Sequence, residues 1–354
     1  MSELHISRNP GRDNETGTAP ESESHKSARF GYILCLDGVR AASILLVILA
    51  HTAPLGPKSW VLNMTAARMG MALFFCLSGF LITSILYRKP DVLPFIVKRV
   101  MRIFPALFIY LTVLLIFFDL PLKAYLLNLS FTSNYLVEGL IPRQTSHLWS
   151  LCVEIHFYLA IGLVVLLLGR RGVWLVFPAA LVITALRIDA GVNSNINTHL
   201  RVDEILVGGW LALISLHKGD QLRRILAAPL VATLTITVLT VLFVISSHDY
   251  GGPLPYVRPY IAMALIGAIM HCSLRPLLDI LESRPAQYIA KISYALYIWH
   301  PLMVYGWMDQ GSTAQRYLLK RPVSWALTWV AAHLSTTYWE SFWQKKVRQW
   351  LGGR

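Results

Sequence analysis

Runs of apolar residues that are long enough to cross a lipid bilayer repeat along almost the whole sequence. An α-helix needs about 20 mostly apolar residues to span the hydrocarbon layer. Ten such runs cover approximately residues 33–53, 69–87, 103–120, 147–168, 172–187, 200–216, 226–246, 257–273, 289–308 and 322–341. We therefore predict an all-α, polytopic transmembrane bundle of about ten helices, with room for a further short or re-entrant segment at 121–136.

The charged residues support a membrane protein and predict its orientation. Only 14% of the residues are charged, whereas soluble domains carry about 25%. A net charge of +13 would suggest nucleic acid in a soluble protein, but here the basic residues gather in short loops between the apolar runs. Lys and Arg favour the cytosolic side, and they are about twice as frequent there if both termini are cytosolic. We expect cytosolic termini, a lipid bilayer around the chain and no nucleic-acid partner.

The two ends of the chain differ from its apolar centre. Residues 1–30 are polar, mix both charge signs and lack an apolar core, which predicts a disordered cytosolic tail and no cleavable signal peptide. Residues 31–342 form the predicted membrane domain, and residues 343–354 a short basic cytosolic tail. The four cysteines lie in apolar runs without a CxxC pair, so we expect neither a metal site nor a disulfide framework.

Arg40 and His51 lie inside the first apolar run. Ionisable groups are costly in lipid, so each is a candidate functional residue. Their spacing of eleven residues turns a helix by about 1100°, or three turns and about 20°, and separates them by about 16 Å along its axis. The two side chains therefore share one face, with Arg40 in the inner half and His51 near the outer end. Alone, the arginine could snorkel or pair with Asp37 and the histidine could be interfacial; the shared face favours function.

A polar stripe opens the fourth apolar run. Ser150, Glu154 and Tyr158 repeat every four residues and lie on one helix face. In the predicted topology this is the outer end of a span, where a carboxylate needs a partner or a water-filled cavity. Structural ion pairing is the alternative, but a stripe of three polar residues favours a lined cavity.

Further polar candidates stand at the outer ends of other runs. Arg201 and Asp203 begin the sixth run, where a plain interfacial cluster is equally consistent with the pattern. His300 is followed by Pro301 near the outer end of the ninth run, which suggests a kinked helix that lines a pocket. With His51, these residues predict a polar chamber in the outer half of the membrane.

A basic cluster precedes the third run on the cytosolic side. Arg99 and Arg102 are three residues apart and face the same way on a helix, as two guanidinium groups that hold a phosphate would. On charge alone, a topogenic anchor is the simpler interpretation. The overall pattern nevertheless predicts a phosphate-bearing donor that binds inside and whose reactive end reaches outward.

Five segments resemble the acyltransferase-3 family of membrane O-acyltransferases, in the order in which that family carries them. The matching segments are residues 36–51 (R-x10-H), 74–83 (FFxLSGFLIT), 99–102 (R-x-x-R), 147–158 (H-x-WSLxVExxFY) and 292–301 (ISYxLYxWHxP). The resemblance covers about residues 33–341. One departure is visible, because the family's VEEQFY keeps its first acid as Glu154 but has Ile155 and His156 at the next two positions.

The resemblance implies transfer of an acyl group, most often acetyl, from acyl-CoA to a hydroxyl of an extracytoplasmic glycan. It also implies a multi-pass protein of the bacterial inner (plasma) membrane in which Arg40 and His51 are essential. Arg99 and Arg102 would hold CoA, with Arg40 as a further contact. Some relatives carry a C-terminal SGNH domain; this chain ends at Arg354, so we expect a stand-alone membrane module. The class of glycan stays open.

A mechanism follows from this resemblance as a hypothesis. His51 acts as general base on the acceptor hydroxyl and Glu154 supports it. Ser150, Trp149 or backbone donors hold the oxyanion, and an acyl intermediate on His51 or Ser150 stays open as a variant. The remaining candidates for the acceptor pocket are Trp149, Tyr158, Arg201, Asp203 and His300.

A proton-coupled transporter is the competing interpretation, because intramembrane Arg, His and Glu also mark proton pathways. The sequence shows no repeat that relates its two halves, although transporters often carry one. Binding of acyl-CoA would separate the two hypotheses, since a transporter has no need of it.

Overall fold

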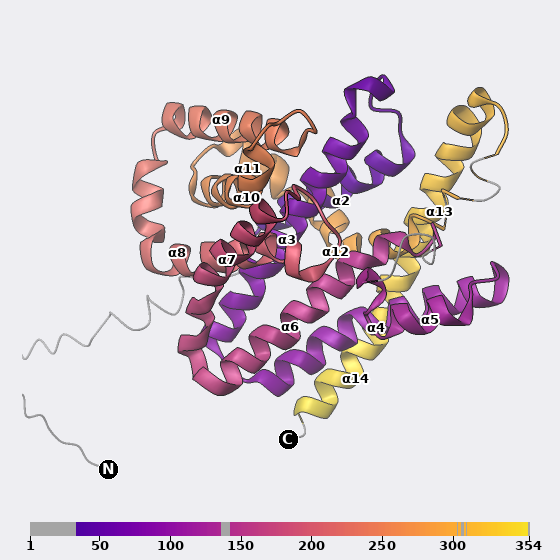
Figure 1. Cartoon of the computed structure of the whole chain (residues 1–354), viewed down its shortest axis with the longest axis horizontal. Helices are drawn as coiled ribbons and strands as arrows, with labels where there is room; N and C mark the ends of the chain where they lie inside the picture. The colour runs from indigo at the N-terminus through magenta and orange to yellow at the C-terminus, as the bar shows by residue number, and fades with distance from the viewer. Residues whose placement is uncertain (1–32, 136–141, 303, 306–307, 309, 353–354) are drawn as a thin grey trace, which may run out of the picture. The chain divides into compact units, whose positions relative to one another are not determined.

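The computed structural model describes residues 33–135, 142–302, 304–305, 308 and 310–352. Within these ranges the chain is helical and contains no strand, which confirms the all-α prediction (Figure 1). The polar tail predicted at 1–30 lies outside the described residues. The α-helices are α2 (Cys35–Thr52), α3 (Leu62–Arg88), α4 (Val92–Phe117), α5 (Leu122–Leu129), α6 (Trp149–Leu168), α7 (Val176–Asp189), α8 (Asp203–Ile225), α9 (Pro229–Ser247), α10 (Leu254–His271), α11 (Arg275–Leu281), α12 (Arg284–Trp299), α13 (Arg321–Leu334) and α14 (Ser341–Gly352).

The helices follow the apolar runs closely. Each of the ten predicted runs overlaps a helix, and α5 lies within the short segment suggested at 121–136. Two π-helical turns, Gln315–Lys320 and Ser335–Glu340, flank α13, and the second leads into α14. The basic segment 343–354, which the sequence suggests as a tail, is therefore largely helical.

Helix length and composition identify fewer membrane spans than the ten that the sequence predicts. Five helical stretches in the described part of the chain are long and apolar enough to cross a membrane, and a sixth counts if α10 and α11, bent by 104°, form one span. Among the helices outside this set, α8 carries charges at both ends and α12 has only 16 residues. The count of ten spans and the cytosolic termini stay predictions.

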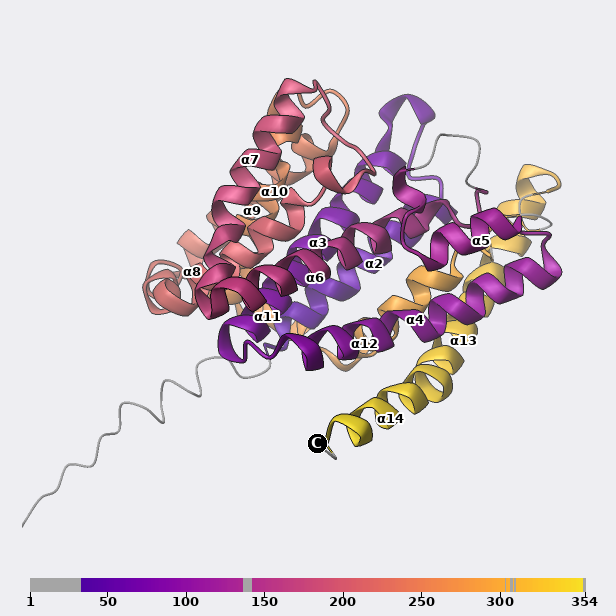
Figure 2. The same cartoon turned by 60° about the horizontal axis from the view of Figure 1, so that its bottom comes forward.

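Helices α2, α3 and α6 run side by side, as Figures 1 and 2 agree, and α8 packs against α3. Two glycines allow this contact at backbone distance. A Cβ atom on Gly79 would lie 1.8 Å from the Ile205 carbonyl oxygen, and one on Gly208 would lie 1.9 Å from the Cys76 carbonyl oxygen. Gly79 thus serves close helix packing, as small residues commonly do in membrane helices. This packing fixes the start of α8 beside the centre of α3.

We expect Gly208→Ala to destabilise the folded protein by about 3 kcal/mol or more, because the new methyl group meets backbone that cannot move alone. In an ordinary helix the same change stabilises by about 1 kcal/mol. Thermal unfolding of the purified protein in detergent measures the effect. Gly352→Ala is the matched control, since a Cβ there has no atom within 4 Å. Equal melting temperatures for the two variants would contradict the packing argument.

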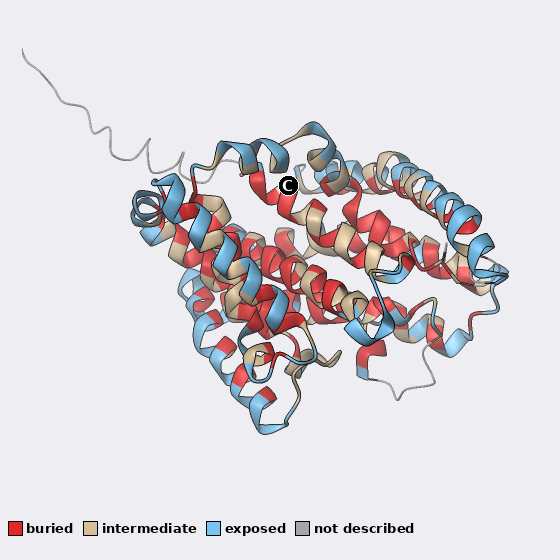
Figure 3. Cartoon of the chain, turned by 90° about the horizontal axis from the view of Figure 1, so that it is seen from above, coloured by how far each residue is buried: buried red, intermediate tan, exposed pale blue. Residues whose placement is uncertain are grey.

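The outer helices present apolar side chains outward. On α9 the exposed residues include Leu230, Leu234, Val238 and Val241, and only 22% of the apolar window of this helix is buried. Figure 3 shows the buried residues on the inner helices and the exposed ones along the outward faces. Contiguous exposed apolar surface of this kind is typical of contact with lipid.

Candidate functional site

A cavity of about 440 Å³ lies among the ends of α2, α6 and α12, and we call it the histidine cavity. Its size falls in the range of about 300–1,000 Å³ that is usual for small-molecule sites. The ring of His51 lies 5.1 Å from that of His300, which lies 5.4 Å from that of His147, measured between centroids. The site-forming residues that line it include His51, His147, Trp149, Arg201, Tyr297 and His300.

His51 stands in the last turn of α2, and its ring is accessible from the cavity. Its Nδ1 lies 2.8 Å from the carbonyl oxygen of Val47, one turn earlier. A carbonyl oxygen can only accept a hydrogen bond, so Nδ1 carries the proton and Nε2 keeps its lone pair. The helix backbone thereby fixes the tautomer that a general base needs.

His300 has the same arrangement, with Nδ1 2.8 Å from the carbonyl oxygen of Tyr297. His147 differs, because it is only 7% exposed and neither of its ring nitrogens meets hydrogen-bond geometry with another described residue. Buried polar atoms without a partner are rare. His147 is the first residue of the H-x-WSL segment, but no pattern in the sequence marks it as a site residue.

Ser150 lies behind the cavity wall and not on it. Its hydroxyl is fully buried, 2.6 Å from the hydroxyl of Tyr297, which donates to the His147 carbonyl oxygen at 2.5 Å. Tyr297 has only one proton to donate, so Ser150 donates to Tyr297. Ser150 is therefore placed to hold Tyr297 in position, and the direct catalytic contact expected of Ser150 is not what this geometry offers.

A second, much smaller space of about 20 Å³ lies between α2, α4 and α6, and we call it the neck. Glu154 and Arg40 line it together. The Glu154 carboxylate accepts hydrogen bonds from Ser78 at 2.9 Å and from Tyr158. The full set of polar neck residues is Arg40, Ser78, Arg99, Arg102, Glu154, Tyr158, Ser293 and Tyr294.

The expected pairing of Glu154 with His51 is therefore corrected. His51 lines the histidine cavity, whereas Glu154 lies among the arginines of the neck. The stripe of Ser150, Glu154 and Tyr158 is too long to line a single space, because each step of four residues advances about 6 Å along a helix. Ser150 lies beside the histidines and Tyr158 in the neck, so one helix face serves two spaces.

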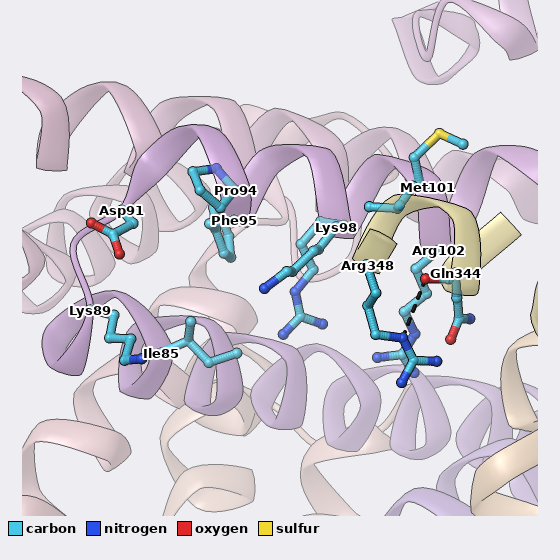
Figure 4. A pocket seen from close by; sticks show the side chains of 12 residues that line it. Ile85, Lys89, Asp91, Pro94, Phe95, Lys98, Met101, Arg102, Gln344 and Arg348 are labelled. Carbon is cyan, nitrogen blue, oxygen red and sulfur yellow. Dashed lines mark hydrogen bonds between the residues drawn. The ribbon is translucent and has the colours of Figure 1, made fainter. Parts of the chain in front are cut away.

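A third space of about 430 Å³, the basic pocket, lies between α4 and α14 (Figure 4). Arg99 and Arg102 line both this pocket and the neck, so the two spaces adjoin at these guanidinium groups. The sequence prediction that the two arginines face the same way is confirmed. Five basic residues line the basic pocket, namely Lys89, Lys98, Arg99, Arg102 and Arg348, against one carboxylate, Asp91.

A buried charge network supports the wall of the histidine cavity opposite α2. Asp203 is fully buried and pairs with Arg187, so the expected contact of Asp203 with a substrate is replaced by a structural ion pair. Glu204 pairs with Arg201 at 3.2 Å and with Arg258 at 3.2 Å. Arg201 lines the cavity, as expected, and its guanidinium group lies 5.5 Å from the Trp149 ring. No group of three His, Cys, Asp or Glu in the described residues could hold a metal ion.

Comparison with known proteins then decides the family. A family model described as an acyltransferase domain matches residues 33–339. The chain belongs to this family. It is 28% identical over 322 residues to the O-acetyltransferase OatA of Staphylococcus aureus (strain NCTC 8325 / PS 47), covering 77% of this chain and 51% of the relative. It is 30% identical over 328 residues to the putative peptidoglycan O-acetyltransferase YrhL of Bacillus subtilis (strain 168), covering 79% of this chain and 50% of the relative.

The matched part thus spans about half the length of these relatives. No solved structure gives a significant match. The family match covers the linings of the neck and the histidine cavity, but it ends before Gln344, Val347 and Arg348 of the basic pocket.

Proposed function

We propose that the chain is a multi-pass membrane O-acyltransferase of the bacterial inner membrane. It moves an acyl group from cytosolic acyl-CoA to a hydroxyl of an extracytoplasmic glycan. The observation that carries the proposal is a series of three spaces, of which the first two adjoin at Arg99 and Arg102. A basic pocket suits the phosphates of CoA, an arginine-lined neck follows, and a histidine cavity stands beyond it. The names of the relatives support acetyl as the acyl group and peptidoglycan as the first acceptor to test.

One aromatic pair separates the neck from the histidine cavity. Phe74 lines the neck, Tyr297 lines the cavity, and their rings are stacked with centroids 6.3 Å apart. Helix α2 connects the same two spaces, because Arg40 lines one and His51 the other. The axial distance of about 16 Å between these residues suits an extended pantetheine arm, which would bring the thioester from the arginines to His51.

His51 acts as the general base in this mechanism. Its Nε2 takes the proton of the acceptor hydroxyl while the hydroxyl oxygen attacks the thioester carbonyl carbon. The carbon–sulfur bond breaks, the ester forms, and the proton passes from Nε2 to the sulfur, which leaves as the CoA thiol. The Val47 carbonyl holds the imidazole in the required tautomer, which is the role that the sequence hypothesis gave to Glu154.

Donors for the developing oxyanion are available in the cavity wall. Trp149 lines the cavity, and its indole N–H can donate a hydrogen bond there. Preorganised donors of this kind are usually the largest single contribution to acyl transfer. Glu154 remains in the neck, where its negative charge offsets part of the charge of Arg40, Arg99 and Arg102.

The test is acyl transfer across a sealed membrane. Purified protein is reconstituted into liposomes, acetyl-CoA labelled in the acetyl group is supplied to the face that carries the basic pocket, and peptidoglycan glycan strands are supplied to the other face. We expect labelled ester on the glycan and CoA thiol on the donor side. Folded protein that neither binds acetyl-CoA nor releases its thiol would overturn the donor assignment and favour the transporter hypothesis. Thiol release without a labelled glycan would change only the acceptor.

A further inference from the structure

The C-terminal helix α14 forms one wall of the basic pocket. Gln344, Val347 and Arg348 line it, and their spacing of three and four residues places them on one helix face. Figure 4 shows the Arg348 side chain reaching from α14 to the side of Arg102. Arg348 Nε donates to the Gln344 carbonyl oxygen at 3.3 Å, which directs the guanidinium group along this face. In the sequence, Arg348 falls in the segment 343–354 that is predicted as a basic tail.

The preceding turn and the buried Val347 hold α14 in place beside α4. The preceding π turn carries Trp339, whose indole N–H donates to the Pro105 carbonyl oxygen in α4 at 2.8 Å. Glu340 is buried and accepts a hydrogen bond from Ser335 at 3.0 Å. Val347 is 9% exposed and anchors the middle of the helix. The position of α14 beside α4 is therefore set by the fold.

The basic pocket carries an excess of positive charge at this end. Within the described residues, no carboxylate lies at ion-pair distance from Arg99, Arg102 or Arg348. Asp91 is the one carboxylate of the lining, and in Figure 4 it lies at the opposite end of the pocket from Arg348. Like charges that converge in a partly desolvated pocket repel each other unless an anion binds between them. Planar guanidinium groups suit phosphate oxygens.

The phosphates of CoA stand in two places, a diphosphate that carries the pantetheine arm and a 3′-phosphate on the ribose. The diphosphate fits at Arg99 and Arg102, because these residues also line the neck through which the arm must pass. Arg348 lines the basic pocket and not the neck. We propose that Arg348 binds the 3′-phosphate of the donor, and that α14 thereby makes the donor site specific for CoA over 3′-dephospho-CoA. This inference rests on the proposed function.

The test compares the affinities of CoA and 3′-dephospho-CoA for the full chain, purified in a neutral detergent and measured by calorimetric titration. We expect Arg348→Ala to weaken binding of CoA about tenfold and to leave 3′-dephospho-CoA unchanged, since one charged hydrogen-bond partner is lost. Arg348→Lys should recover part of the CoA affinity, because it keeps the charge but not the two-pronged geometry.

Lys345→Ala and Lys346→Ala are the matched controls. Each removes one positive charge from the same helix, yet neither residue lines the basic pocket, and the Lys346 ammonium lies 4.8 Å from the Phe342 ring. Both controls should bind the two ligands as the unaltered chain does. An Arg348→Ala variant that weakens both ligands equally, or neither, overturns the inference. If the folded, unaltered chain binds neither ligand, the proposed donor itself fails, which is a distinct result.

Discussion

Replacing His51 with alanine is expected to lower acyl transfer by about a hundredfold to ten-thousandfold, which is the usual contribution of a positioned general base. The Nε2 lone pair that would take the acceptor proton is lost, whereas no contact of the basic pocket changes. Binding of CoA should therefore stay within about twofold of the unaltered value. The measurement is the initial rate of labelled ester formation in reconstituted vesicles, at equal amounts of folded protein.

The chain offers a closely matched control at His217. Its Nδ1 also lies 2.8 Å from a carbonyl oxygen four residues earlier, that of Leu213, but its ring packs against Tyr87 and Trp174, outside the histidine cavity. His217→Ala removes the same side chain from the same local geometry and should retain transfer. A His51→Ala variant that keeps more than a tenth of the rate would exclude His51 as the base. Equal losses in both variants would point to a general effect on folding.

The sequence correctly predicts which residues share a helix face, but it does not predict which other helices that face contacts. The spacing of Arg40 and His51 correctly indicates two positions on one continuous helix, and α2 carries both into polar spaces. Helical periodicity tells which side chains share a face but not what that face meets along its length. Glu154 therefore could not be assigned to the neck from its stripe, because α4 and its arginines come from another part of the chain.

Residues outside the regular helices were the hardest to recognise. His147 stands in a 3-10 turn before α6, where no periodic pattern marks its direction, although three-dimensional packing brings it beside His300. Asp203 does lie in a helix, but a charge at the start of a span suggests a pocket, whereas its partner is Arg187 in the last turn of α7. Pairs of this kind form through tertiary packing, so the local sequence pattern around each residue does not predict them.

Fewer helices qualify as membrane spans by hydropathy than the sequence predicts, and the polar side chains of the functional spaces explain part of the difference. Helices that build polar spaces must carry polar side chains, which lowers the very signal by which spans are recognised. Helix α8 begins with Asp203 and Glu204 and packs with backbone contact against α3 through Gly208. It is buried in the bundle and supports the cavity wall, yet it falls outside the set selected by length and apolar composition.

The double change Arg99→Ala/Arg102→Ala is expected to weaken binding of CoA by at least about a hundredfold. Each guanidinium group supplies charged hydrogen bonds worth about 1.5–3 kcal/mol, and a tenfold change in affinity corresponds to about 1.4 kcal/mol. Both residues line the basic pocket and the neck, so both CoA and 3′-dephospho-CoA should be affected. Calorimetric titration of the purified chain measures the loss.

The control for this change is Lys345→Ala/Lys346→Ala, which removes the same net charge from α14 without touching the pocket lining. If the two double variants lose affinity for CoA equally, the arginines act only through the general positive potential of this face. That result would refute direct binding of the CoA phosphates by Arg99 and Arg102. A loss confined to Arg99 and Arg102 requires direct contact. These two side chains also border the neck. If they only anchored the donor, their loss would lower the affinity for CoA and leave the rate at saturating donor unchanged. A lower rate at saturating donor would therefore indicate that they also direct the thioester toward His51.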